Sequence, residues 1–126
     1  MIVDANVFIT LAGNPTRLNA FLRASRSGRR ELVTTQAIVA QVWRGGREAN
    51  LARALKATSI EDDFGDGRAI GLACVCEDDP DVVDASLAWW AKQKDTSVLS
   101  ADPDVKRYAD RIGARVLHPG TDSVGM

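Results

Sequence analysis

Residues 2–9 read IVDANVFI, an apolar segment that the polar stretch Asp4-Ala5-Asn6 interrupts. An apolar run that stops at polar residues is typical of a buried strand followed by a turn, and we expect that structure here. A carboxylate within such a segment is costly to bury without a partner. Asp4 is therefore the first candidate for a functional residue, and Asn6 either orients it by a hydrogen bond or only shapes the turn.

Strand-like and helix-like segments alternate along the rest of the chain. Asn14-Pro15, Asp79-Pro80 and Asp102-Pro103 each place a capping side chain before a proline, which is typical of a helix start. The predicted strands are 31–34, 58–60, 96–100 and 114–117, and the predicted helices are 15–27, 35–42, 51–55, 70–74, 80–90 and 103–112. Because neighbouring parallel strands need helical crossovers, this alternation predicts an α/β domain with a mainly parallel sheet.

The size and composition of the chain are typical of one soluble globular domain. It has 126 residues, of which 45% are apolar and 26% are charged, and we expect residues 1–126 to form a single domain. No secretory signal or membrane span is visible, so we expect a cytoplasmic protein. Cys74 and Cys76 fit neither a zinc pair nor a redox Cys-x-x-Cys motif, and we interpret them as buried thiols.

The distribution of charge limits how the chain can bind nucleic acid. The net charge of −1 argues against a protein that coats nucleic acid through bulk charge. Positive residues nevertheless gather at Arg23, Arg26, Arg29 and Arg30, and again at Arg44, Arg47 and Arg53. These arginines form either solvated helix faces or a surface that follows phosphates.

Three aspartates from distant parts of the chain are expected to meet at one edge of the sheet. Asp4 ends the first predicted strand, Asp84 lies in the first turns of a helix, and Asp102 follows the fourth predicted strand. Ligands of open α/β sheets bind at the carboxyl ends of the strands. Two carboxylates about 5 Å apart repel by about 3 kcal/mol at an effective dielectric near 20, so a cation should offset them. Hard oxygen ligands select Mg²⁺ or Mn²⁺.

Each acid also has a purely structural explanation. Asp102 before Pro103 is a good helix N-cap, and Asp81 and Asp84 can simply favour the positive end of their helix. Two other acidic α/β classes fit poorly. A haloacid-dehalogenase-like phosphatase needs a second aspartate where this chain has Asn6, and a receiver domain needs an aspartate at the end of its third strand together with a late lysine.

Four segments in succession resemble the motifs of PIN-domain proteins. They are IVDANVFI (2–9), AQVWR (40–44), DVVDA (81–85) and VLSADPD (98–104). They stand in the family's order and span nearly the whole chain. The chain length and the segment QVWR resemble in particular the VapC toxins of bacterial toxin–antitoxin pairs.

This resemblance implies a three-layer fold, a bound Mg²⁺ or Mn²⁺ ion and endonucleolytic cleavage of RNA, inhibited by a cognate VapB-type antitoxin. It assigns the first, third and fourth acidic ligands to Asp4, Asp84 and Asp102, with Asp104 as an auxiliary. It also implies a homodimer. The apolar residues Trp43, Leu51 and Leu55 either form a surface for this homodimer or belong to the core.

The second ligand position departs from the family pattern. Most of the family has a glutamate where this chain has Gln41, and a neutral amide removes one negative charge from the site. Asp81 or Asp104 can supply the missing charge, and an exposed helical glutamine needs no function.

Two hypotheses of different classes follow. In the first, Asp4, Asp84 and Asp102 hold a divalent ion that activates water for hydrolysis of a phosphodiester, and Arg44 or the arginines from Arg23 to Arg30 contact RNA phosphates. In the second, the acidic pocket has decayed and the PIN-like domain acts mainly by binding a partner. A shift in melting temperature on metal titration separates the two.

Overall fold

A five-stranded parallel sheet forms the centre of the molecule. The computed structural model describes residues 1–28, 30–43 and 49–120. Within them the strands are β1 (Ile2–Val3), β2 (Val33–Thr35), β3 (Ser59–Glu61), β4 (Ser97–Leu99) and β5 (Arg115–Leu117). The strands lie in the order β3-β2-β1-β4-β5, and every neighbouring pair is parallel. The predicted α/β class is confirmed, and the sheet of the described residues is wholly parallel.

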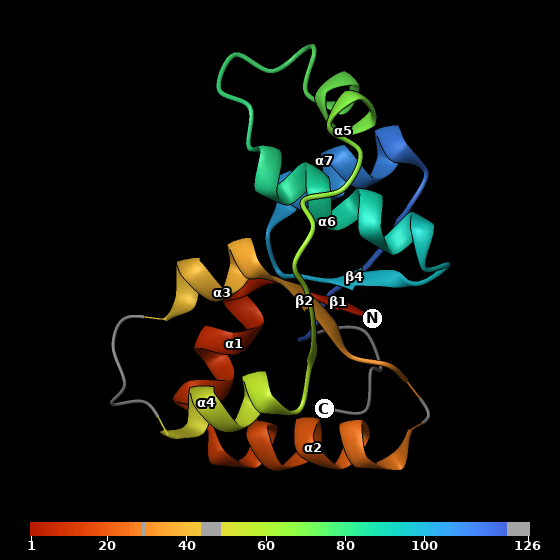
Figure 1. The fold of residues 1–126 in the computed structure, drawn as a ribbon. Helices are drawn as coiled ribbons and strands as arrows, with labels where there is room; N and C mark the ends of the chain where they lie inside the picture. The colour runs from red at the N-terminus through yellow and green to blue at the C-terminus, as the bar shows by residue number, and fades with distance from the viewer. Residues whose placement is uncertain (29, 44–48, 121–126) are drawn as a thin grey trace.

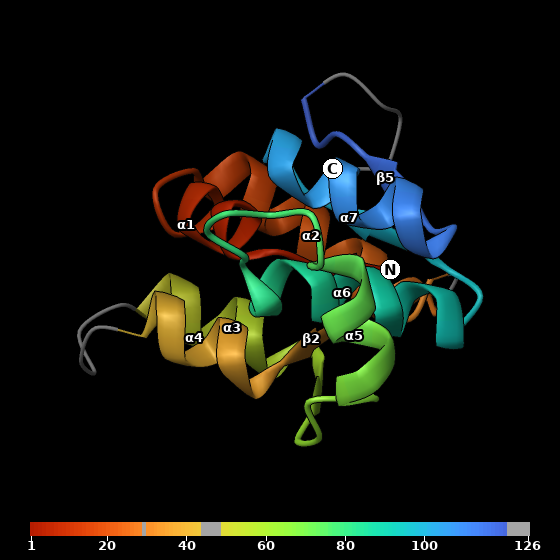
Figure 2. The ribbon, with the colours of Figure 1, turned by 90° about the horizontal axis from the view of Figure 1, so that it is seen from above.

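Helices cover both faces of this sheet. They are α1 (Ala5–Ala12), α2 (Pro15–Ser27), α3 (Gln36–Val42), α4 (Ala49–Lys56), α5 (Gly67–Ala73), α6 (Val82–Gln93) and α7 (Pro103–Ile112). Helix α1 packs against α2, α3 and α4 on one side, and α6 packs against α5 and α7 on the other (Figure 1). Figure 2 looks from above onto the side of α5, α6 and α7. The result is the three-layer arrangement that was expected.

The strand order reverses beside β1, which is the central strand. The chain moves outward from β1 through β2 to β3, and then returns to place β4 on the other side of β1. Ile2 is paired with Val33 of β2 and with Val98 of β4. The connections that leave β1 and β4 therefore diverge, and a crevice at such a switch point is where ligands of open α/β sheets bind.

Apolar side chains from both helical layers bury the sheet. Ile2 and Val3 are fully buried, and Phe8 of α1 meets Phe21 of α2 edge to face with ring centroids 6.1 Å apart. A second, smaller cluster lies between α5, α6 and α7 around Tyr108. Val7 of α1, Ala85 of α6 and Val105 of α7 belong to these two clusters, so the first turns of all three helices pack into the core.

Several predicted boundaries differ from the structure, and two of them lie next to the candidate site. Residues 4–6 do not form a turn, because α1 starts at Ala5 and Asp4 is its N-cap, with its carboxylate accepting a hydrogen bond from the Ala5 N–H (2.7 Å). Helix α6 does not start at Pro80. The Asp81 carboxylate caps it by accepting hydrogen bonds from the N–H groups of Val83 and Asp84, so the helix begins two residues later than Asp79-Pro80 indicated.

The structure shows which of the apolar residues and thiols singled out in the sequence are buried. Leu51 and Leu55 are buried in the core, whereas Trp43 is 41% exposed. Cys74 is buried but Cys76 is exposed, so the interpretation of both as buried thiols is wrong for Cys76.

Among the described residues, no helix combines the length and the apolar character that crossing a membrane requires.

Candidate metal centre

Asp4, Asp84 and Asp102 meet in the folded chain, as the sequence predicted. One carboxylate oxygen from each residue lies within 4.8 Å of the oxygens from the other two. Asp4 follows β1, Asp102 follows β4, and these two strands flank the point where the strand order reverses. The three carboxylates therefore lie where this fold class places its ligands.

Each of the three residues lies at the start of a helix. Asp4 is the N-cap of α1 and Asp102 is the N-cap of α7, where its Oδ1 accepts a hydrogen bond from the Asp104 N–H (2.9 Å). Asp84 lies in the first turn of α6. Helix N-termini carry a partial positive charge that favours anions, so the local structure tolerates these carboxylates. The capping explanation and the ligand explanation of Asp102 are thus compatible.

A set of hydrogen bonds fixes the Asp4 carboxylate, which is only 4% exposed. Its Oδ1 accepts from the Ala5 N–H, and its Oδ2 accepts from the Ser100 hydroxyl (2.6 Å) and from the Asn6 side-chain amide (3.2 Å). The carbonyl oxygen of the same amide accepts from the Ala101 N–H (3.1 Å). Asn6 therefore joins Asp4 to the segment that follows β4.

Ser100 is a residue of the site that the sequence analysis missed. Its hydroxyl is buried, donates to Asp4 and accepts from the Asp102 N–H (3.0 Å). One hydroxyl thus connects two of the three aspartates. The only signal in the sequence is its place between a buried strand and Asp102, and a serine at a strand end is too common to be singled out.

Burial and mutual repulsion raise the pKa values of two of the aspartates. Burial, together with the smaller effects of the charges of Asp81, Asp4 and Asp102, raises the pKa of Asp84 to about 7. Burial also raises the pKa of Asp4, although the hydrogen bonds from Ser100 and Ala5 oppose the rise. At 4.8 Å, two carboxylates repel by about 3 kcal/mol at an effective dielectric near 20. Near neutral pH this site therefore favours binding of a proton or a cation.

The residues present fit a divalent ion. Within the described ranges, no lysine, arginine or histidine forms a salt bridge with Asp4, Asp84 or Asp102. Buried carboxylates normally have a charged partner or hold a metal. Three carboxylates without a cationic partner are therefore a suitable donor set for a small, hard divalent ion.

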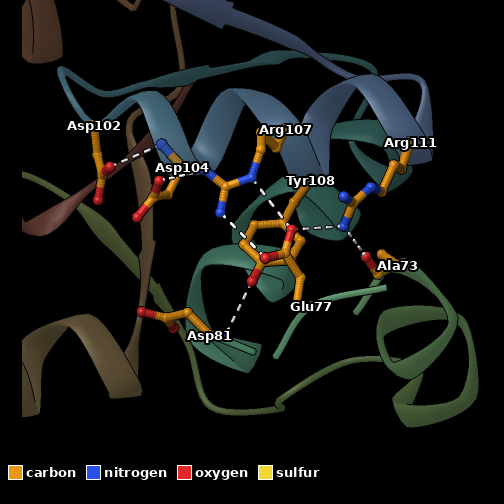
Figure 3. A network of polar contacts seen from close by, with 8 residues as sticks. All are labelled: Ala73, Glu77, Asp81, Asp102, Asp104, Arg107, Tyr108 and Arg111. Atoms are coloured by element: carbon orange, nitrogen blue, oxygen red, sulfur yellow. Dashed lines mark hydrogen bonds and ion pairs between the residues drawn. The ribbon is translucent and has the colours of Figure 1, made fainter. Parts of the chain in front are cut away.

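Of the expected auxiliary residues, Asn6 contacts the triad through Asp4, whereas Asp81, Asp104 and Gln41 are not among its members. Asp81 caps α6, and Asp104 forms an ion pair with Arg107 on α7 (Figure 3). Gln41 is exposed on α3, and in the part of the chain that the structure describes no hydrogen bond joins it to the three aspartates. Arg44, the expected RNA contact, lies outside the described residues, as do Arg29 and Arg47.

The remaining arginines of the two basic groups are exposed. They are Arg23, Arg26, Arg30 and Arg53. Solvated helix faces and a phosphate-binding surface both agree with this exposure.

The chain has no match among the protein-family models, the curated proteins or the solved structures with which it was compared. Its function is therefore inferred from the fold and from the chemistry of the carboxylate site.

Proposed function

We propose that this protein is a metal-dependent endoribonuclease of the PIN-domain type, a VapC-like toxin that hydrolyses RNA phosphodiester bonds. The main support is the cluster of Asp4, Asp84 and Asp102 at the switch point of a parallel sheet, with no cationic side chain paired to it among the described residues. A divalent ion bound by these carboxylates can also bind a phosphate, because its positive charge offsets the negative charges of the carboxylates and of the phosphate.

In this proposal Asp4, Asp84 and Asp102 hold Mg²⁺ or Mn²⁺. When bound, the ion would lower the pKa of a coordinated water and neutralise the charge that develops on the phosphate. Ser100 and Asn6 keep the Asp4 carboxylate oriented through their hydrogen bonds. The starts of α1, α6 and α7 add partial positive charge beside the position of an RNA phosphate.

RNA cleavage by aspartate variants tests this proposal. Asp4→Asn and Asp102→Asn should each abolish Mn²⁺-dependent cleavage of a mixed RNA substrate, because each variant removes a ligand charge. Asp110→Asn is the matched control, since Asp110 is exposed on α7 and pairs only with the exposed Lys106 among the described residues. If Asp4→Asn and Asp102→Asn cleave as fast as the wild type, the assignment is wrong.

A second candidate function is a PIN-like domain that binds a partner without cleaving RNA. The neutral, exposed Gln41 at the second ligand position favours it. Mn²⁺ titration separates the two functions, because an ion that binds only the folded state stabilises it by RT ln(1 + [L]/Kd), or about 2.7 kcal/mol at 100 times Kd. A melting temperature that does not change with Mn²⁺ would support the partner-binding function.

The proposed toxin requires a cognate VapB-type antitoxin, and we expect it to act in the cytoplasm as a homodimer. Trp43 is exposed and can contribute to the dimer surface, whereas Leu51 and Leu55 are buried within the protomer. A short neighbouring gene for a DNA-binding antitoxin is the expected genomic context. Co-expression of that gene product should suppress both toxicity and RNA cleavage.

A further inference from the structure

Helix α7 bears Asp102 at its start and Tyr108 further along its length. Tyr108 is 1% exposed, and its ring packs in the apolar cluster between α5, α6 and α7. Its hydroxyl accepts a hydrogen bond from the backbone N–H of Asp81, at 2.9 Å (Figure 3). A buried hydroxyl is unfavourable unless it is hydrogen-bonded, so this contact compensates the burial of the group.

Asp81 also contacts the backbone of Asp84, one of the three aspartates of the candidate metal centre. The carboxylate of Asp81 accepts hydrogen bonds from the N–H groups of Val83 (3.0 Å) and Asp84 (3.1 Å). Two successive hydrogen-bonding steps therefore link the Tyr108 hydroxyl to the backbone of Asp84. Since Tyr108 and Asp102 belong to the same helix, these two hydrogen-bonding steps also connect Asp84 to Asp102.

Further polar contacts hold the segment before α6, residues 73–81, against α7. Glu77 forms ion pairs with Arg107 (3.2 Å) and Arg111 (3.0 Å), one helical turn apart and on either side of Tyr108 along the chain. Arg111 also donates to the carbonyl oxygen of Ala73 (2.8 Å). In Figure 3 these side chains form one network that reaches from Ala73 to Asp81. The 73–81 segment is thus attached to α7 at both of its ends and at Glu77.

We propose that Tyr108 is a positioning residue of the metal centre: through Asp81 it sets where Asp84 lies relative to Asp102. The identity of the reaction rests on the proposed function, whereas the geometry of the ion site rests only on the three aspartates. Phenylalanine would fill the same apolar space, so the hydroxyl serves the Asp81 contact and not the packing. Small divalent ions demand a nearly ideal arrangement of ligands, which makes the position of Asp84 important.

Mn²⁺ affinity, measured by isothermal titration calorimetry, tests the role of Tyr108. Loss of a partner that hydrogen-bonds directly to a metal ligand typically lowers metal affinity about 10-fold to 100-fold. Tyr108 acts one contact further out, through Asp81, so Tyr108→Phe should weaken Mn²⁺ binding by up to about tenfold. RNA cleavage by this variant should recover at saturating Mn²⁺, because its three ligands are intact. Glu77→Gln, which weakens the attachment of the 73–81 segment, should shift affinity in the same direction.

A core variant on the other face of the sheet separates positioning from general destabilisation. Phe21 is fully buried in α2, and Phe21→Leu should lower the free energy of unfolding without changing Mn²⁺ affinity. The inference is overturned if Tyr108→Phe binds Mn²⁺ like the wild type, or if Phe21→Leu weakens binding equally.

The outcomes also distinguish this inference from the proposed function. A wild-type protein that binds no Mn²⁺ contradicts both. Mn²⁺ binding that depends on Tyr108, without any RNA cleavage, supports the positioning role and contradicts the ribonuclease. RNA cleavage that requires Asp4 but is unchanged by Tyr108→Phe at limiting Mn²⁺ supports the ribonuclease and contradicts the positioning role.

Discussion

At the scale of single residues, burial and the charges of the neighbouring aspartates act together on the pKa of Asp84. It is 7% exposed, and its pKa of about 7 results from burial first and from the neighbouring aspartates second. Asp4 differs because Ser100 and Ala5 donate hydrogen bonds to its carboxylate and partly offset the effect of burial. The site thus combines one carboxylate, Asp4, whose hydrogen bonds oppose the rise in pKa that burial causes, with another, Asp84, whose pKa rises to about 7.

The raised pKa of Asp84 predicts how the stability of the metal-free protein depends on pH. In the unfolded chain the carboxyl ionises near pH 4, whereas in the folded protein it ionises near pH 7. The folded state therefore binds more protons in this range, and its stability falls as pH rises from about 4 to about 7. Urea denaturation in the presence of EDTA at pH 5 and pH 8 should show lower stability at pH 8.

Asp84→Asn should remove most of this dependence. A pKa change of one corresponds to about 1.4 kcal/mol, so the variant should be more stable than the metal-free wild type at pH 8 by on the order of 2 to 4 kcal/mol. It should also bind Mn²⁺ poorly. A variant that is less stable than the wild type at pH 8 would indicate a structural role for the carboxylate instead.

The Ser100 hydroxyl should contribute to both stability and metal binding. Ser100→Ala removes a donor to Asp4 and an acceptor for the Asp102 N–H, and the loss of buried hydrogen bonds should cost about 1 to 3 kcal/mol. Mn²⁺ affinity should fall as well. Ser86→Ala is the control, because Ser86 is an equally buried serine whose hydroxyl donates to the Val83 carbonyl oxygen. Equal Mn²⁺ affinity in the two variants would contradict the role given to Ser100.

At the scale of elements, the site depends on where three helices start. Helices α1, α6 and α7 begin beside the triad, and their N-caps are Asp4, Asp81 and Asp102. The helix starts therefore orient the carboxylates and supply favourable partial charge. Helix α5 provides a comparison, since it is also capped by an aspartate, Asp66, but contributes no residue to the triad.

Two cap variants separate helix stability from metal binding. Asp66→Ala and Asp81→Ala each remove a carboxylate that accepts from two N–H groups, and each should cost about 1 kcal/mol of stability. Only Asp81→Ala should alter Mn²⁺ affinity, measured calorimetrically, because Asp81 orients the start of α6 and raises the pKa of Asp84. If the two variants change affinity alike, the link between the α6 cap and the site is absent.

The sequence predicts most of these elements because their signals are local. Buried parallel strands are apolar, and the proline after Asn14 or Asp102 marks a helix start. Helix α1 was not predicted. Strand β1 has only two residues, and the apolar Val7 and Phe8 that follow it soon after have the composition of a continued strand. Asp79-Pro80 predicted the start of α6 two residues too early, because the Asp81 carboxylate, rather than that of Asp79, accepts hydrogen bonds from the first turn of the helix.

The candidate site is predictable to a different extent. The three aspartates can be found because each adjoins a predicted strand or helix start. The contributions of Ser100 and Tyr108 depend on which elements become neighbours in the fold. A hydroxyl after β4 and a tyrosine inside α7 carry no sequence signal that shows which backbone or carboxylate they reach.

At the scale of the whole molecule, the strand order brings the site together. Asp4 and Asp102 are distant in sequence, yet β1 and β4 are adjacent strands whose outgoing chains diverge. Helix α6 crosses the same face of the sheet as α7 and brings Asp84 to them. The strand order and the helix contacts support one site for a divalent ion at these three carboxylates.

Anomalous X-ray scattering at the manganese absorption edge, from crystals grown with Mn²⁺, tests this claim by locating the bound ion. We expect an anomalous peak between the carboxylates of Asp4, Asp84 and Asp102, and its disappearance in crystals of Asp84→Asn. Crystals of the wild type that bind Mn²⁺ elsewhere, or not at all, would contradict the claim.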